Sequence, residues 1–254
     1  MKIALPKIMV GTLYSGESEI VQCKSIIQNQ IGVQVEHIVI PNLPEAKAHR
    51  ALFDIWNKRR TEFEIFVKCD ADTVLKDERS LLSIVEYKLK NNFDGLQLRL
   101  LDYFSKQYIY GLGVFSNRVV FDKPRKKLYP DRVVDRDKYS ILSGNKFSFL
   151  EPIGYHCLNP HPVQSFRFGL HRELKNQESI IADTAKNWLI EKDEARMWAL
   201  IGAFHAKDHW RNSINYSDKK FKRIFDSYLI SNKSITDLVT RVSETWPGKN
   251  SKEI

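Results

Sequence analysis

The chain has 254 residues, of which 43% are hydrophobic and 28% are charged, and this composition excludes a largely disordered protein. Its formal net charge of +9 predicts an anionic partner, namely nucleic acid, an anionic lipid surface or a phosphorylated small molecule. No apolar run reaches the roughly 18 residues of a membrane span. The apolar stretch at the N-terminus is interrupted by Pro6 and Lys7 and is too short for a signal peptide. We therefore expect a soluble protein.

The cysteines indicate the cellular compartment, and the distribution of charge indicates the kind of partner. Cys23, Cys69 and Cys157 lack the spacing of a metal-binding motif and cannot all pair with one another, which favours a reducing, cytoplasmic compartment. Basic residues gather in segment 121–139, but acidic residues are interspersed there, and none of the common short nucleic-acid-binding signatures occurs. We do not expect nucleic acid as the partner. A basic face leaves a reversible, peripheral contact with an anionic membrane open.

The first hundred residues alternate between strand-like and helix-like patterns. Helical periodicity separates short β-branched or apolar runs, and the predicted strands are 7–12, 33–40, 63–68 and 93–101, with helices at 18–30, 44–60 and 77–92. This alternation predicts an α/β fold with a mostly parallel sheet flanked by helices and joined by right-handed crossovers.

The pattern changes in the second half of the chain. Shorter strands with turn signals occupy 103–155, and a helical pattern follows Pro162 almost to the end. We therefore expect one domain at 1–162 and a helical C-terminal extension at 163–254 that packs on it.

The third predicted strand ends in two carboxylates, Asp70 and Asp72, separated by one small residue. Ligands of open α/β sheets bind at the carboxyl ends of the strands, and the loop 11–17 after the first strand reaches the same edge. Two carboxylates there suit Mg²⁺ or Mn²⁺, which bridge protein oxygens to substrate phosphates. The sequence predicts a nucleotide or another diphosphate ester as substrate.

These segments, in this order, resemble the GT-A glycosyltransferases, in particular the family-two-like enzymes that use nucleotide sugars. The resemblance covers about residues 7–160 and is carried by KIMVGT, LYSGE, CKSIIQNQ, VEHIVI and FEIFVKCDAD. It implies a GT-A (Rossmann-like) fold with a DxD motif. The implied activity, of the kind used in polysaccharide biosynthesis, is metal-dependent transfer of a sugar from a nucleotide diphosphate to a saccharide or lipid-linked acceptor, by direct displacement with inversion.

The resemblance also implies roles for individual residues. Asp70 and Asp72 match the pair that holds the donor's ribose and its metal-bound diphosphate, and Thr12, Tyr14 and Glu17 match the loop that encloses the base.

The chain departs from the family after the second strand, where members commonly carry an acidic phrase and this sequence reads IPNLPEAKAHR. Asn42 in this phrase is our candidate for hydrogen bonding to a uracil or ribose. The base itself stays open.

Many GT-A enzymes complete the metal or diphosphate site with a histidine or a basic residue from a later segment. Our choice for the third metal ligand is His156, at the end of an apolar strand, with His161 second. On the predicted helix after Pro162, Arg167 and His171 lie four residues apart and face the same side, where they would hold the leaving diphosphate.

Direct displacement needs a general base for the acceptor hydroxyl. The acidic segment YPDRVVDRDKY resembles the phrase that family-two enzymes place after their acceptor segment. We select Asp135, with Asp131 and Asp137 as alternatives and Glu151 as a fourth candidate.

Two other functions remain open from the sequence. A nucleotidyltransferase acting on a sugar phosphate also needs carboxylate-held metal and phosphates, and a non-catalytic sugar- or nucleic-acid-binding module would use the basic segment. A glycosyltransferase releases free nucleoside diphosphate, whereas a nucleotidyltransferase releases pyrophosphate. Binding without turnover that is unaffected by removal of the metal would indicate the binding module.

Overall fold

The computed structural model describes residues 5–123, 134–135, 137–143, 151–209, 223 and 226–227. The chain forms two compact units. The first consists of Met1–Leu101 and Tyr108–Leu158, and the second of Asp102–Gln107 and Asn159–Ile254. Each unit is described by itself.

Within the described residues the first unit is built on an eight-stranded mixed sheet with the order β2-β1-β3-β6-β5-β8-β4, in which β7 also pairs with β5. The strands are β1 (Lys7–Tyr14), β2 (Gln34–Pro41), β3 (Ile65–Lys68), β4 (Thr73–Leu75), β5 (Gly95–Asp102), β6 (Tyr108–Ser116), β7 (Ile141–Ser143) and β8 (Gly154–His156).

The parallel core of the sheet is the part that the sequence predicted. β1 pairs in parallel with both β2 and β3. The α/β class and the helices after Pro162 are confirmed, and the layout is consistent with the GT-A expectation.

The expected sheet has its parallel core in β1, β2 and β3, and beyond β3 it becomes mixed. β6 lies between β3 and β5 and is antiparallel to both. The turn after β5 reverses the chain, so β6 runs antiparallel to β5, and on its other side β6 pairs with β3.

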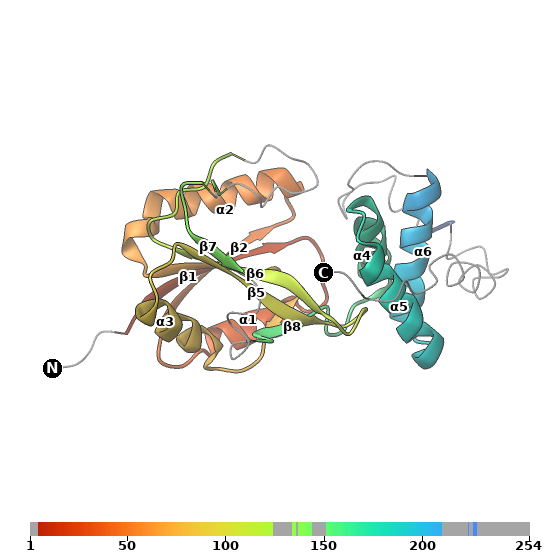
Figure 1. Ribbon diagram of the computed structural model, residues 1–254. Helices are drawn as coiled ribbons and strands as arrows, with labels where there is room; N and C mark the ends of the chain where they lie inside the picture. The colour runs from red at the N-terminus through yellow and green to blue at the C-terminus, as the bar shows by residue number, and fades with distance from the viewer. Residues whose placement is uncertain are drawn as a thin grey trace. The chain divides into compact units, whose positions relative to one another are not determined.

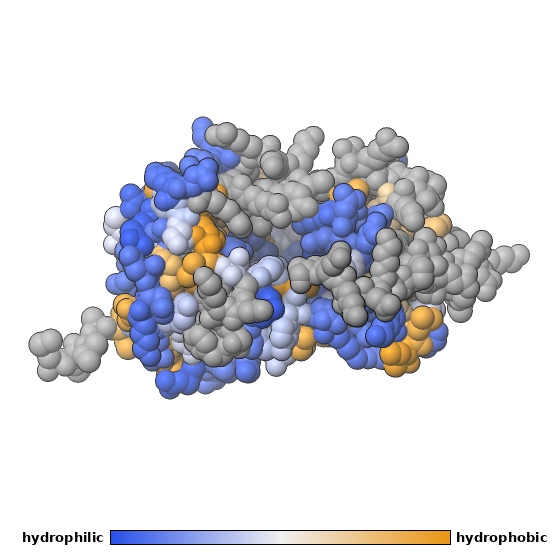
Figure 2. Space-filling model, viewed as in Figure 1, coloured by the Kyte–Doolittle hydropathy of each residue, from blue (hydrophilic) through white to orange (hydrophobic). Residues whose placement is uncertain are grey.

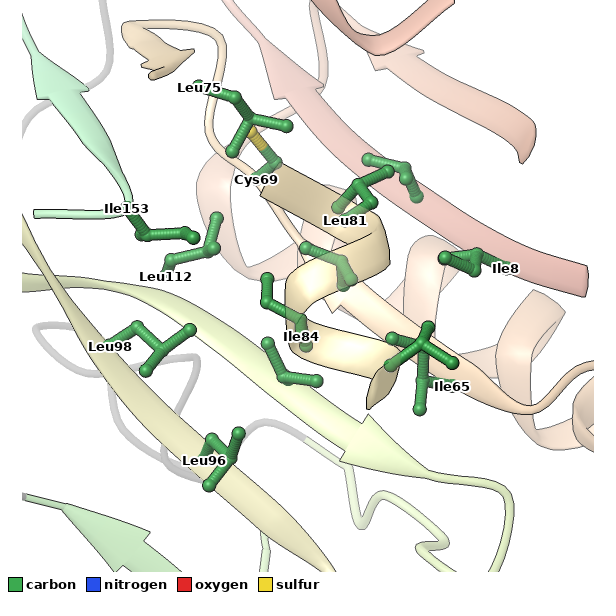
Figure 3. Close-up of a cluster of buried hydrophobic side chains, with 14 of the residues drawn as sticks. Ile8, Ile65, Cys69, Leu75, Leu81, Ile84, Leu96, Leu98, Leu112 and Ile153 are labelled. Carbon is green, nitrogen blue, oxygen red and sulfur yellow. The ribbon is translucent and has the colours of Figure 1, made fainter. Parts of the chain in front are cut away.

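Helices cover both faces of this sheet (Figure 1): α1 (Ile20–Gln28) and α3 (Ser80–Lys90) on one side and α2 (Glu45–Arg59) on the other, with a short 3-10 helix η1 (Arg60–Glu62) after α2. Alternation along β1 explains the two layers, since Ile8 and Val10 enter the cluster under α1 and α3 while Met9 enters the cluster under α2. Figure 3 shows the first cluster, where Ile84 from α3 packs among side chains of the strands.

The second unit consists, in its described part, of α4 (Pro162–Leu174), α5 (Glu178–Glu191) and α6 (Glu194–His209) together with the turn Asp102–Gln107. Its core is a separate cluster that includes Phe166, Leu170, Trp188 and Trp198. Burial of such large side chains is what holds three short helices together, because helices of this length are marginal in isolation.

No helix among the described residues is both long enough and apolar enough to cross a membrane. The described surface visible in Figure 2 is largely hydrophilic, with hydrophobic residues in small groups.

Candidate metal and donor site

The DxD segment leaves the sheet at the carboxyl end of β3. The Cys69 amide donates a hydrogen bond to the Gly11 carbonyl at 3.0 Å, so the β1–β3 pairing extends to the residue before Asp70. β1 continues three residues further, to Tyr14, before its own loop begins. Both loops therefore start at the same edge of the parallel core, as predicted for a ligand site in an α/β sheet.

Asp72 meets His156, the last residue of β8, and Cys157, which directly follows it. The Cys157 amide donates to the Asp72 carbonyl at 2.8 Å, and Thr73 pairs with His156 in the β4–β8 ladder. The Asp72 Oδ2 atom lies 3.5 Å from His156 Nε2 and 3.8 Å from Cys157 Sγ. One ligand atom from each of the three residues lies within 4.8 Å of the others. The short strand β4, which the sequence analysis did not predict, creates this meeting.

The donor set fits Mn²⁺ better than Mg²⁺. Carboxylate oxygen and imidazole nitrogen both suit Mn²⁺, whereas Mg²⁺ prefers oxygen alone. Burial raises the pKa of the Cys157 thiol to about 12, and sulfur suits softer metals than Mn²⁺. Asp72 and His156 are therefore the two residues that would hold the ion. Their assignment as ligands stays a prediction.

Cys157 is the member of this group that the sequence analysis set aside. It looks solitary in the sequence because the Asp72 carboxylate that it contacts lies 85 residues away. Its backbone has a positive φ of 52°, so the strand alternation ends at His156 and both side chains face Asp72. No spacing rule for a single cysteine contains this information.

Asp70 is not part of the three-residue group. Both of its carboxylate oxygens accept from Lys68 Nζ, at 2.7 and 2.8 Å. The Lys68 side chain is 11% exposed and that of Asp70 is 41% exposed, so the ammonium is covered while the carboxylate faces outward. Lys68 neutralises Asp70 and leaves it able to accept from a hydroxyl, which agrees with the ribose role better than with the metal role. Both roles stay predictions.

The predicted nucleotide loop is held by its own contacts. Thr12 is fully buried, and its Oγ1 lies 2.8 Å from His37 Nε2. The buried Glu17 carboxylate accepts from the Ser15 amide at 2.7 Å and from the Ser15 hydroxyl at 2.8 Å. These bonds fix the shape of the loop, so Thr12 and Glu17 act on the loop itself, and their contact with a base remains a prediction.

Tyr14 and Asn42 come together at the ends of β1 and β2. The exposed Asn42 has a φ of 54°, and its amide donates to the Tyr14 carbonyl at 2.8 Å. Asparagine tolerates this left-handed backbone better than most residues do. The structure thus brings two predicted nucleotide-binding residues side by side, although their sequence positions gave no indication of this bond.

The later histidines and the arginine belong to the second unit. His161 is the N-cap of α4, where its Nδ1 accepts from the Gln164 amide at 3.1 Å. Arg167 and His171 both lie on α4 and are half-buried. Capping gives His161 a structural role, and the assignment of Arg167 and His171 to the leaving diphosphate stays a prediction.

Of the general-base candidates, Asp131 lies outside the described residues. Asp135 and Asp137 are exposed, and Asp135 Oδ1 accepts from the Asp137 amide at 3.0 Å, an ordinary turn contact. Glu151 is different, because its side chain is 1% exposed and is paired with Arg99. A buried, paired carboxylate is poorly placed to receive a proton, so Asp135 and Asp137 remain the open candidates in the described chain.

Comparisons with known proteins give structural likenesses at low identity. No family model and no curated protein sequence matches this chain. The mannosyltransferase PcManGT from Pyrobaculum calidifontis, solved in complex with GDP-Man and Mn²⁺, is similar at 12% identity with a TM-score of 0.43, over 94% of this chain and 85% of that one.

Two further solved structures resemble the chain. A197 from STIV is 10% identical with a TM-score of 0.39, over 54% of this chain and 81% of that one. TarS from S. aureus is 8% identical with a TM-score of 0.38, over 98% of this chain and 56% of that one. At these identities no activity transfers to this chain by similarity alone.

Proposed function

We propose that this chain is a metal-dependent glycosyltransferase that moves a sugar from a nucleotide diphosphate donor to a saccharide or lipid-linked acceptor. The observation that carries the proposal is the approach of Asp72 to His156 at the carboxyl end of the parallel strands. Their side chains are 22% and 13% exposed and lie 3.5 Å apart. This is a carboxylate and an imidazole at the sheet edge where α/β folds bind ligands.

The chemistry of the proposal is charge neutralisation and positioning. When bound, Mn²⁺ stabilises the negative charge of the departing diphosphate. Asp72, directly before β4, and His156, at the end of β8, would hold the ion, and the β4–β8 pairing sets their separation. Asp70, oriented by Lys68, accepts from the donor's ribose hydroxyl. Asp135 is our proposed base for the acceptor hydroxyl, in a direct displacement with inversion.

The experiment that tests the metal site is a thermal-shift panel of nucleoside diphosphates with and without Mn²⁺. Ligand at about 100 times its Kd stabilises the native state by about 2.7 kcal/mol. Asp72→Asn should abolish the Mn²⁺-dependent nucleotide shift, because the amide removes the charged ligand and keeps the side-chain shape. The melting temperature without ligands should stay near that of the wild type.

The matched control is Asp54→Asn, an exposed carboxylate paired with Arg50 on α2. It should keep the full nucleotide shift. An Asp72→Asn protein that retains the shift would contradict the proposal. Measuring the product then separates the reactions, since a glycosyltransferase releases nucleoside diphosphate and a nucleotidyltransferase releases pyrophosphate.

A further inference from the structure

A β-bulge at Gly111 reverses the faces of the first residues of β6. Leu98 pairs with Leu112 and the next residue, Arg99, pairs with Tyr110, so Gly111 is an extra residue in the ladder. A Cβ at Gly111 would lie 2.4 Å from the Leu100 side chain, which explains the glycine. Without the extra residue, Tyr110 would face the core as Leu112 does.

The bulge places two exposed tyrosines on the same face of the sheet. Tyr108 is 48% exposed and Tyr110 is 54% exposed, whereas Ile109 between them is 7% exposed. Residues two apart on a strand share a face. Arg99 pairs with Tyr110 across the ladder, and its guanidinium carbon lies 5.3 Å from the centroid of the Tyr108 ring. We call Arg99, Tyr108 and Tyr110 the tyrosine platform.

The charge on the platform is balanced. Glu151, with a side chain that is 1% exposed, accepts from Arg99 Nε at 2.5 Å and contacts Nη2 at the same distance. Its other oxygen accepts from the Arg99 amide at 2.9 Å. Both side-chain contacts use the Nε–Nη2 edge, so the Nη1 hydrogens remain directed away from Glu151. The platform therefore combines two aromatic rings with hydrogen-bond donors, and the charge of its guanidinium is paired with Glu151.

The platform lies at the same edge of the sheet as the candidate donor site. The β3–β6 ladder ends with Lys68 opposite Gly113. Because the strands are antiparallel, the residues of β6 before Gly113 extend beyond the end of β3 from which Asp70 and Asp72 follow.

We infer that the tyrosine platform binds the acceptor as a neutral saccharide. Tyrosine rings supply large, rigid contact faces for the C–H faces of sugar rings, and the phenol and guanidinium hydrogens meet sugar hydroxyls. Single-stranded nucleic acid also stacks on aromatic rings, but it needs cations for its phosphates. The cation of this platform is already neutralised by Glu151, so an uncharged ligand fits better. This inference rests on the proposed glycosyltransferase function, for which it supplies the acceptor class.

The test is saturation-transfer difference NMR of the full chain with maltotetraose, cellotetraose, mannotetraose and chitotetraose as probes. Tyr108→Ala and Tyr110→Ala should each weaken binding of the recognised probe about tenfold, the equivalent of roughly 1.4 kcal/mol for one lost stacking contact. Tyr108→Phe and Tyr110→Phe keep the ring and should restore most of the signal. Leu89→Ala, which truncates a side chain that is 72% exposed on α3, is the control and should bind like the wild type.

Two results would overturn the inference: no signal from any neutral probe with the wild-type protein, or an equal signal from the protein carrying both alanines. Stronger binding of an oligonucleotide that the alanines abolish would assign the platform to nucleic acid instead. The Mn²⁺-dependent nucleotide shift, recorded on the same variants, separates the two hypotheses. If the wild-type protein shows the nucleotide shift but binds no saccharide, only the inference about the platform is refuted. If the wild-type protein shows no Mn²⁺-dependent nucleotide shift, the proposed function is refuted.

Discussion

At the scale of single residues, burial and pairing decide which groups around the candidate site are available to a substrate. The Cys157 thiol, enclosed beside Asp72, has a pKa raised to about 12 and remains a neutral thiol. Glu151 is covered and paired with Arg99, which makes it part of the scaffold. Asp70 faces outward with Lys68 beside it. The exposed or half-exposed groups are thus the ones available to a substrate.

The lowered pKa of His37 leads to a prediction about the pH dependence of folding stability. Desolvation, followed by the charge of Lys24, lowers the pKa of His37 to about 4. Between an unfolded pKa near 6.5 and a folded value of about 4, the unfolded chain binds a proton that the native state does not, so stability falls as pH falls through this window. We expect His37→Gln to lose less stability between pH 7 and pH 4.5 than the wild type does.

The measurement is the urea midpoint at both pH values. Glutamine keeps a hydrogen-bonding group near Thr12 Oγ1, so the comparison isolates the titration. Equal pH dependence in both proteins would show that His37 does not titrate in this range. An NMR titration of the His37 ring provides an independent check.

At the scale of elements, α4 and α6 pack with their backbones in contact. A Cβ built at Gly169 would lie 1.7 Å from the Ala199 carbonyl oxygen, and one at Gly202 would lie 1.9 Å from the Phe166 carbonyl oxygen. Glycine in a helix interior is unfavourable by about 1 kcal/mol relative to alanine. The two glycines therefore lower the helix propensity of α4 and α6, but they allow the two helices to approach closely.

We expect Gly169→Ala to destabilise the protein, by about 1–3 kcal/mol net, because the carbonyl cannot move without separating the helices. The thermal unfolding midpoint measures the effect. Ser179→Ala, at an exposed position of α5, raises helix propensity without entering the contact and should change stability by less than about 0.5 kcal/mol. A Gly169→Ala protein as stable as this control would show that the helices accommodate the methyl group.

At the scale of the whole molecule, the first unit is interrupted by a piece of the second. The turn Asp102–Gln107 follows β5 and precedes β6, yet it belongs to the helical unit. Arg196, whose side chain is 1% exposed, holds this turn: its Nε donates to the Phe104 carbonyl at 2.9 Å and its Nη2 to that of Tyr103. The guanidinium also pairs with Glu191 and Asp193, at 2.7 and 2.8 Å.

Arg196→Met should therefore cost on the order of 3 kcal/mol, because methionine fills the volume but removes the buried guanidinium that donates to the Phe104 and Tyr103 carbonyls. Arg50→Met removes an exposed pair with Asp54 and should cost less than about 0.5 kcal/mol. Denaturant unfolding followed by circular dichroism compares the two. Similar losses for both variants would mean that Arg196 does not anchor the turn.

The sequence by itself determined what local patterns encode. Alternating periods of apolar residues predicted the α/β class, the helices after Pro162 and the position of the DxD segment at the end of a strand. These features depend on residues that are a few positions apart, so they can be predicted from the sequence alone.

The tertiary structure alone decided the pairing of distant segments. The insertion of β6 beside β3, the ion pair of Glu151 with Arg99 and the approach of Cys157 to Asp72 depend on registers between strands far apart in the chain. The meeting of Asp72 with His156 was expected, but the strand β4 that produces it was not. A register is set by the sum of many weak contacts across the whole sheet, and no single stretch of sequence contains that sum.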